Sequence, residues 1–380
     1  MNAHERVEHA IRLQPVARDQ IPVAPLIITF VGRLARVKQA ELFSGVQAWR
    51  QAVDRAIDRL GPPDMGFALW VRDVPFSEGM RYRLPGRELG DDELFQIIEA
   101  EVMQRSDYER LLSIGYGRWS MDYFVSLQPA LPAGALGRAI VTVQFIRMAL
   151  RIRGNAARLE RRGVVPAFYA GGYPPFDFFS LARSIMEFSQ DLCDCPELVR
   201  KACDASVDPI LATMMQPIQA TGGKRVCIYP MRSSTTFISP KMFEGMALEH
   251  LRRMTEFFVG RGITPILHCD ANWTPLLPYF RELPRARCIL ELDDDTDIFR
   301  AKEVLGDWMC LKGNVPATLL AFGAVEEVEA YCEKLIHEVG RGGGFILGSG
   351  CEVPLNAKVE NVAAMFRVAR GIRKAGSATA

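Results

Sequence analysis

The chain has 380 residues, of which 49% are hydrophobic and 24% are charged, and these ordinary globular values exclude a disordered or fibrous protein. The chain has 46 basic and 45 acidic residues. Its net charge is therefore too small to attract nucleic acid or an anionic membrane surface. The charged amino terminus has no apolar core, and arginines interrupt the most apolar long stretch, residues 139–152. We therefore expect a cytoplasmic protein with no nucleic-acid or membrane partner.

Eight β-rich runs alternate with helical patterns, which is typical of an α/β protein with a parallel sheet. Several runs are almost continuously apolar, as expected for strands buried on both faces. Eight such units favour a single (β/α)8 TIM barrel over residues 1–375, with a doubly wound open sheet as the alternative and residues 376–380 as a disordered tail. The expected strands are Pro22–Phe30, Met65–Arg72, Val164–Gly171, Arg225–Met231, Thr264–Asp270, Arg287–Asp293, Trp308–Asn314 and Gly343–Ser349.

A long interval separates the second and third expected strands. Residues 73–162 contain helical patterns near 91–112 and 134–161, and the second pattern is rich in arginine. We expect a helical insertion that covers one end of the barrel. Its arginines predict either a solvated helix face or a docking surface for an acidic partner.

One of the five histidines differs from the others in its surroundings. His268 closes the apolar run 263–267, whereas the other four lie in expected helices. Barrel enzymes build their sites at the carboxyl ends of the strands. Residues two apart on a strand share a face, so His268 and Asp270 point to the same side.

Two other strand ends carry further candidate metal ligands. The last expected strand runs into Gly348-Ser349-Gly350, whose glycines allow a sharp turn that leaves Cys351 at the same rim. Glu291 and Asp293 share a face at the end of the sixth strand. Imidazole, thiolate and carboxylate are zinc ligands, so the set predicts a zinc site with an open position. The alternative is a group of residues that close strand ends and cap the following helices.

Weaker candidates lie at the same rim. Arg232 is a candidate either for orienting an anionic substrate group or for a structural ion pair. Asn314 is a candidate either for hydrogen-bonding the substrate or for closing a turn. We take Asp270, Asn314 and Arg232 as the catalytic candidates. Four residues are candidates for a substrate pocket that receives a planar ring, or else for packing: Tyr173, Tyr229, Met231 and Trp273.

Five short motifs keep a fixed order over the last part of the chain: Phe237–Lys241, Gly262–Asp270, Thr296–Ile298 with Ala301–Glu303, Leu311–Val315, and Gly344–Leu347 followed by Cys351 and Asn356–Asn361. On these motifs the sequence resembles the uroporphyrinogen decarboxylase superfamily, and more closely its corrinoid-dependent methyltransferase branch. The resemblance implies a (β/α)8 barrel. It fades in the first 160 residues.

The resemblance also separates the two branches of that superfamily. The decarboxylases have an Arg-Gln-Ala-Gly-Arg signature after the first strand, where this chain has Phe30–Arg36, and Gly-His-Gly after the last strand, where it has Gly348–Gly350. The methyltransferases have a His-x-Cys pair after one strand and a cysteine after the last, all of which bind zinc. His268 and Cys351 match this pattern, but Asp270 stands in place of the middle cysteine.

A carboxylate in place of a thiolate hardens a metal site and favours oxygen ligands. The resemblance, with this departure, implies a zinc-dependent O-demethylase that moves a methyl group from an O-methyl donor, such as an aryl methyl ether, to the cob(I)alamin of a separate corrinoid protein. The chain itself has no Asp-x-His-x-x-Gly stretch to bind cobalamin. Alternatives are a metal-independent decarboxylase, a thiol-directed corrinoid methyltransferase and a catalytically idle scaffold. A homodimer is one option, because related barrels often pair, but the sequence does not determine the oligomeric state.

Overall fold

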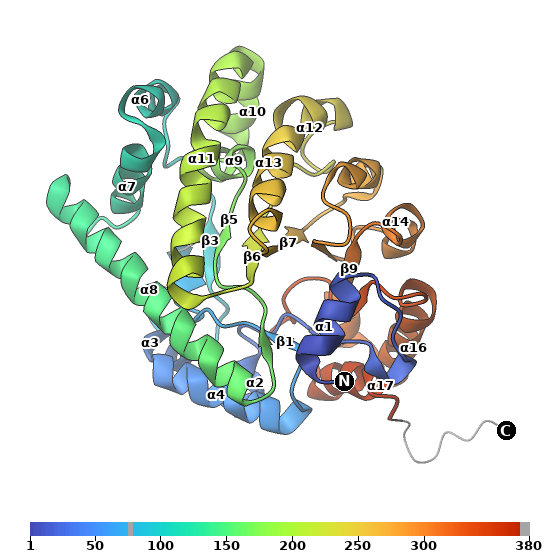
Figure 1. Ribbon diagram of the computed structural model, residues 1–380. Helices are drawn as coiled ribbons and strands as arrows, with labels where there is room; N and C mark the ends of the chain where they lie inside the picture. The colour runs from blue at the N-terminus through green and yellow to red at the C-terminus, as the bar shows by residue number, and fades with distance from the viewer. Residues whose placement is uncertain (75–78, 373–380) are drawn as a thin grey trace.

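Six parallel strands form the central sheet of the molecule (Figure 1). The computed structural model describes residues 1–74 and 79–372, so the tail expected at residues 376–380 lies outside the described residues. The strand order is β10-β9-β8-β7-β6-β5. The α/β class with a parallel sheet is therefore confirmed. The six strands are β5 Gly171–Gly172, β6 Arg225–Ile228, β7 Thr264–Cys269, β8 Ile289–Leu292, β9 Cys310–Val315 and β10 Phe345–Ser349.

Backbone hydrogen bonds connect this sheet to the first part of the chain. Val23 forms a parallel bridge with Leu347 of β10, and its carbonyl oxygen accepts a hydrogen bond from the Asp64 N–H at 2.8 Å. Next to Asp64, β1 (Met65–Gly66) pairs in parallel with β4 (Val165–Pro166). The arrangement is TIM-barrel-like. The closure of eight strands into one barrel stays a prediction.

The bounds of the expected strands after residue 220 match the structure to within three residues, whereas the first three strands are much shorter than expected. The first, Pro22–Phe30, gives only isolated bridges, because its prolines have no N–H to donate to a neighbour. The third, Val164–Gly171, is split into β4 and β5 because the chain changes partners there. The Ala167 N–H donates a hydrogen bond to the carbonyl of Gly66 in β1, whereas the Tyr169 N–H donates to the carbonyl of Arg225 in β6.

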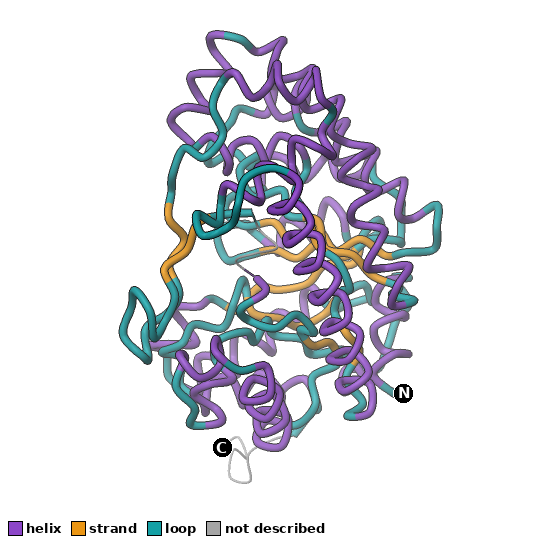
Figure 2. The backbone as a smooth tube through the Cα atoms, turned by 90° about the vertical axis from the view of Figure 1, so that its left-hand side faces the viewer, coloured by secondary structure: helices purple, strands orange, loops and turns teal. Residues whose placement is uncertain are grey.

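Helices surround the six-stranded sheet, which lies in the interior, whereas the β2–β3 pair lies at the edge of the molecule (Figure 2). In the described part of the chain, no helix is long and apolar enough to cross a membrane. The helices are α1 Ala3–Ile11, α2 Val31–Ala35, α3 Gln39–Ser44, α4 Val46–Leu60, α6 Ser106–Ile114, α7 Tyr116–Ser126, α8 Ala135–Arg161, α9 Pro175–Arg183, α10 Ile185–Asp194, α11 Pro196–Thr221, α12 Pro240–Met246, α13 Leu248–Val259, α14 Ile298–Leu305, α15 Ala317–Phe322, α16 Val325–Lys334 and α17 Val359–Ala369, with shorter turns at η1 Arg18–Gln20, η2 Thr274–Glu282 and η3 Leu335–Val339.

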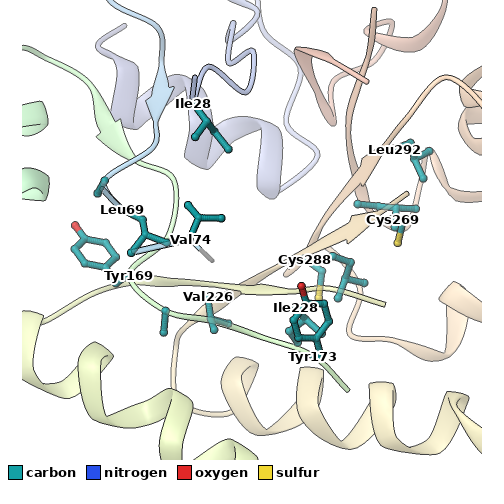
Figure 3. Close-up of a cluster of buried hydrophobic side chains, with 14 of the residues drawn as sticks. Ile28, Leu69, Val74, Tyr169, Tyr173, Val226, Ile228, Cys269, Cys288 and Leu292 are labelled. Carbon is teal, nitrogen blue, oxygen red and sulfur yellow. The ribbon is translucent and has the colours of Figure 1, made fainter. Parts of the chain in front are cut away.

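Two apolar layers cover the two faces of the sheet, because neighbouring residues on a strand point to opposite sides. One layer contains a row of register partners on β6 to β9 together with apolar side chains of α1, and we call this face the inner face. Its row is Cys227, Ile266, Ile289 and Cys310. The larger outer layer includes Val226, Ile228 and Leu292 (Figure 3).

The interval at residues 73–162 is only partly helical. The helix expected near 91–112 begins only at Ser106, because β3 (Gln96–Ile98) pairs antiparallel with β2 (Arg81–Arg83). The second half of α8 buries apolar residues and contacts β4 and α11. The interval therefore combines the β2–β3 pair and the helices α6 and α7 with the long helix α8, which packs beside β4 and α11. The expected helical insertion stays a prediction, and it would exclude the second half of α8.

Four of the seven arginines in α8 and at the position after it form ion pairs with nearby acids. Arg151 pairs with Asp73 at 2.5 Å, and Arg158 and Arg162 pair with acidic residues of α4. These ion pairs favour a solvated helix face over a docking surface for an acidic partner.

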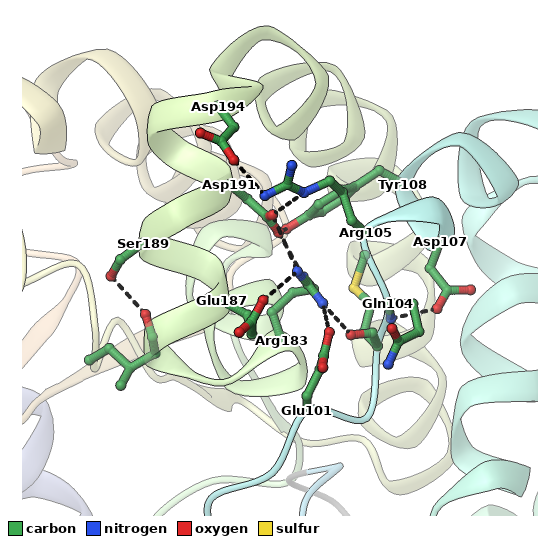
Figure 4. Close-up of polar contacts among 12 residues, drawn as sticks. Glu101, Gln104, Arg105, Asp107, Tyr108, Arg183, Glu187, Ser189, Asp191 and Asp194 are labelled. Atoms are coloured by element: carbon green, nitrogen blue, oxygen red, sulfur yellow. Dashed lines mark hydrogen bonds and ion pairs between the residues drawn. The ribbon is translucent and has the colours of Figure 1, made fainter.

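A buried ionic network ties residues 101–108 to α9 and α10 (Figure 4). Arg183 donates to Asp191 at 2.6 Å, and these two side chains are almost completely buried. Asp191 also accepts hydrogen bonds from Arg105 and Tyr108. Arg183 pairs in addition with Glu101. The network fixes the segment that leads into α6 against the helices that follow β5.

Candidate metal centre

A polar row follows the apolar row on the inner face of the sheet. His268 of β7, Glu291 of β8 and Lys312 of β9 are register partners, each two residues beyond a member of the apolar row. Because residues two apart share a face, the three side chains project to the same side as that row. All three are at least nine-tenths buried. On the inner face, each of these three strands therefore changes from an apolar residue to an ionisable one over two positions.

Three donor groups come together at the carboxyl ends of β7 and β10. The Nε2 atom of His268 lies 3.2 Å from Asp270 Oδ1 and 3.8 Å from Cys351 Sγ. The three donor atoms all lie within 4.8 Å of one another. The structure thus brings His268 and Asp270, at the end of one strand, together with Cys351, which lies 81 positions after Asp270 in the sequence.

The loops that carry these donors are held by backbone contacts. Ser349 Oγ donates to the carbonyl oxygen of Cys351 at 2.6 Å and accepts the Leu26 N–H at 3.0 Å. Gly350 lies against the β8 loop, where an added Cβ would stand only 3.1 Å from the Asp294 nitrogen. A side chain at position 350 would therefore push the Cys351 loop away from its neighbour.

The charges of the cluster depend on one another. Burial alone would lower the pKa of His268, but Asp270, Cys351 and Glu291 outweigh burial and raise that pKa well above its usual value. Burial would raise the pKa of Asp270, yet His268 outweighs it and lowers that pKa. Burial raises the pKa of the Cys351 thiol. Without a metal, the cluster is an imidazolium–carboxylate pair beside a neutral thiol, and a bound dication would replace the protons.

The donor set fits a zinc ion. Ligand atoms on a tetrahedral zinc lie roughly 3.3–3.7 Å apart, given bonds of about 2.1 Å to nitrogen or oxygen and 2.3 Å to sulfur. The separations of 3.2 and 3.8 Å are close to these values. Asp270 Oδ1 is buried, and the described group nearest to it is His268 Nε2 at 3.2 Å, with which it forms an ion pair when the imidazole is protonated. A bound metal ion would supply the positive charge for this carboxylate in place of the imidazolium proton.

Glu291 and Asp293, the other two candidate metal ligands, do not join the three donors. Glu291 turns to the opposite nitrogen of the imidazole, with its Oε2 3.6 Å from His268 Nδ1 and its Oε1 paired with Lys312. Both oxygens of Asp293 accept backbone N–H groups, from Ala271 at 2.5 Å and Asp295 at 3.0 Å. These partners use the oxygens that a metal would need.

Two of the expected catalytic residues have structural partners. Asn314 donates to the carbonyls of Asp293 and Thr296 and accepts from Tyr331 at 2.9 Å, so its amide closes the strand end. Arg232 forms an ion pair with Glu99 at 2.6 Å and also donates to the Ser180 carbonyl. The structure therefore favours the turn-closing role of Asn314 and the ion-pair role of Arg232.

The expected ring-binding residues separate into two groups. The ring of Tyr229 lies 6.0 Å from that of His268, and Tyr173 lies 5.3 Å from Tyr229. Met231 is half-buried and packs against the outer layer. Trp273 is fully buried between Phe243 and Phe280, and its N–H donates to the Asp270 carbonyl. Trp273 is thus a packing residue that supports the Asp270 loop, not a wall of a pocket.

Sequence reasoning missed two aromatic residues and one lysine near the cluster. Phe168 lies 6.4 Å from Tyr229, and Phe67 lies 5.4 Å from Phe168, so the rings form a row that leads to His268. Both phenylalanines fall inside expected strands, where they resemble core residues. Lys312 was detectable as a charged residue in a strand that is otherwise apolar.

Comparison with known proteins identifies the family. Residues 163–372 match the family model described as uroporphyrinogen decarboxylase (URO-D). Because this match spans more than half of the chain, the protein belongs to the uroporphyrinogen decarboxylase family, which indicates an enzyme. The resemblance seen in the motifs is confirmed.

A solved structure extends the likeness over nearly the whole chain. A methyltransferase from Methanosarcina mazei aligns with a TM-score of 0.69 and 17% sequence identity, covering 98% of this chain and 99% of that chain. At this identity the likeness shows a shared fold. A search of curated proteins finds no match.

Proposed function

We propose that the protein is a zinc-dependent methyltransferase that moves a methyl group from an aryl methyl ether to the cob(I)alamin of a separate corrinoid protein. The observation that carries the proposal is the cluster of one imidazole, one carboxylate and one thiol at the carboxyl ends of β7 and β10. The family match and the shared fold with a methyltransferase support it.

His268, Asp270 and Cys351 would hold the zinc. When bound, zinc supplies a Lewis acid that stabilises the negative charge on a departing oxygen. The carboxylate of Asp270 makes this donor set harder than one with two thiolates, which favours an oxygen ligand over a thiol. In the proposed reaction the methyl carbon–oxygen bond breaks with both electrons going to oxygen, and cob(I)alamin provides the electron pair of the new carbon–cobalt bond.

The aromatic row would receive the ring of the donor. Phe67, Phe168 and Tyr229 present adjoining rings that end beside His268. Such rings bury a planar substrate well and exclude water from one side of the site. An aryl group stacked on this row would bring its ether oxygen toward the three donors.

The proposed architecture is a single (β/α)8 barrel over residues 1–375. The support is the parallel bridge of Val23 with β10, whose hydrogen bonds are made by Pro22 and Ala24, together with the Asp64 N–H bond to the Val23 carbonyl and the β1–β4 pair. In a barrel, the carboxyl ends of the strands form one open face, where a partner protein could present its corrinoid. A homodimer stays one option.

The test is a defined mixture of the zinc-loaded protein, a methoxybenzoate and a reduced corrinoid protein, followed by the spectral change from cob(I)alamin to methylcobalamin. We expect methylation of the corrinoid at the expense of the ether. Asp270→Cys should retain zinc but lose most of the ether activity, because a second thiolate softens the site. Methylation of thiols from methylcobalamin, with no ether ever demethylated, would overturn the donor class and the direction of transfer.

A metal-independent decarboxylase is the second candidate, because the matching family model is named for that activity. Such an enzyme needs cations at its rim to bind substrate carboxylates. Arg232, a candidate for this role, is already paired with Glu99, which favours the methyltransferase. Release of carbon dioxide from an acid substrate by metal-free protein would decide for the decarboxylase.

A further inference from the structure

Glu291 and Lys312 form a buried ion pair directly beside His268, one of the three candidate zinc ligands. Their side chains are each 7% exposed, and Lys312 Nζ pairs with Glu291 Oε1. Moving two charges from water into a protein interior is costly, and close pairing offsets that cost only in part. Apolar residues could fill the same space at no such cost. The pair therefore calls for a reason other than stability.

The register of the sheet puts this pair in line with His268. The three residues are direct neighbours across β7, β8 and β9, so their side chains follow one another along the inner face. Glu291 Oε2 lies 3.6 Å from His268 Nδ1, whereas Asp270 and Cys351 approach Nε2 on the other side of the ring. The carboxylate and the metal donors thus face opposite nitrogens of one imidazole.

We propose that Glu291 and Lys312 are positioning residues that orient His268 for metal binding, an inference that rests on the proposed zinc site. A carboxylate at Nδ1 keeps the proton on that nitrogen and leaves the Nε2 lone pair for the metal, and such outer partners also hold the ring in place. Lys312 holds the other oxygen of Glu291. It thereby keeps Glu291 beside the imidazole and prevents it from turning to the metal as a fourth protein ligand, so the site keeps an open position.

The decisive variant is the double replacement Glu291→Leu with Lys312→Met. Replacing a buried ion pair by apolar residues of similar size is often neutral or stabilising, so this variant should fold. We expect its affinity for zinc, measured by competition with a chromophoric chelator, to fall by about 10- to 100-fold, as is usual when an outer partner of a ligating histidine is lost. Thermal unfolding should show no comparable loss of stability.

Two further measurements separate positioning from a structural role. Glu291→Gln should retain more affinity than the double variant, because the amide oxygen can still accept the Nδ1 proton. Glu329→Gln is the matched control, since Glu329 pairs with Arg367 away from the cluster, and it should bind zinc like the unaltered protein. In 15N-histidine spectra of the zinc-loaded protein, the Nδ1–H signal of His268 should shift in the double variant.

The outcomes distinguish this inference from the proposed function. Zinc bound with equal affinity by the unaltered protein and the double variant would overturn the positioning role and leave the zinc site intact. Failure of the unaltered protein to bind zinc would overturn the site itself and the inference with it.

Discussion

Asp270 is the residue that sets the proposed chemistry apart from that of a thiol-directed enzyme. Its buried Oδ1 lies 3.2 Å from His268 Nε2, a separation close to that of two ligands on one metal ion. The neighbouring carboxylates Glu291 and Asp293 have other partners. Among these three acidic residues at adjoining strand ends, Asp270 is the one that joins the imidazole and the thiol, and it is therefore the one that we propose as a ligand.

Cys351→Ala should abolish stoichiometric zinc binding. The thiolate is one of three protein donors, so its loss should weaken zinc more than the roughly 10- to 100-fold that the loss of an outer partner costs. The measurement is zinc content after gel filtration. Cys193→Ala is the control because Cys193 is exposed and lies outside the donor cluster. Full zinc content in Cys351→Ala would exclude this cysteine as a ligand.

At the scale of elements, buried carboxylates attach the loops around the sheet. Asp177 of α9 accepts the N–H groups of Arg232 and Ser233, which follow β6, at 2.7 and 2.9 Å. Asp191 of α10 accepts hydrogen bonds from Arg183, Arg105 and Tyr108. Each carboxylate joins segments far apart in the sequence, and each supports a prediction about stability.

Asp177→Asn should change how stability depends on pH. Burial raises the pKa of Asp177 to about 7, although backbone and Ser233 hydrogen bonds lower it in part. Between the usual carboxyl pKa near 3.8 and this value, the unfolded chain has lost its proton while the folded chain keeps it, so stability falls as pH rises through that window. Asparagine carries no charge and removes this penalty.

We therefore expect the free energy of unfolding of Asp177→Asn, relative to the unaltered protein, to rise by a few kcal/mol, at most about 4, between pH 4 and pH 8. Urea unfolding at several pH values measures this difference. Parallel pH profiles for the two proteins would show that Asp177 does not titrate in this range.

Asp191→Ala should lower the free energy of unfolding by about 3–5 kcal/mol, because it leaves the buried Arg183 guanidinium without its main counterion. Urea unfolding measures the loss. Asp208→Ala is the control, since Asp208 pairs with Arg253 on the surface and should change stability by less than about 1 kcal/mol. Equal effects of the two changes would contradict a stabilising role for the network.

At the scale of the whole molecule, the open question of architecture is the closure of the sheet. The amides of Ala24, Asp64 and Val165 donate to Leu347, Val23 and Asp64, at the junctions that a closed barrel requires. If the barrel closes, these amides should exchange with solvent as slowly as those of β7, because they open only in global unfolding. Exchange as fast as in the exposed β2–β3 pair would refute closure.

The later strands and part of the site were predictable from local sequence. Strands β6 to β10 are short apolar runs buried on both faces, and this pattern is visible without knowledge of any partner. His268 and Asp270 were identifiable because they are two residues apart at the end of such a run. The first strands were predicted too long, since their hydrogen bonds depend on proline positions and on a change of partner.

The roles of the remaining residues depend on partners distant in the sequence. Arg232 forms an ion pair with Glu99, which lies 133 positions away in the sequence. Trp273 has a packing role because Phe243 and Phe280 enclose its ring. No local pattern contains this information.

The sequence by itself determined the α/β class and the family, and it supplied five candidate metal ligands of which the structure brings three together, because alternation of strands and residue types at strand ends are local properties. Only the tertiary structure decided that Glu291 faces the far nitrogen of His268, that Lys312 holds it there, and that Phe67 and Phe168 extend the aromatic row. These are matters of which side chains meet across neighbouring strands, and strand register and side-chain direction exist only once the chain is folded.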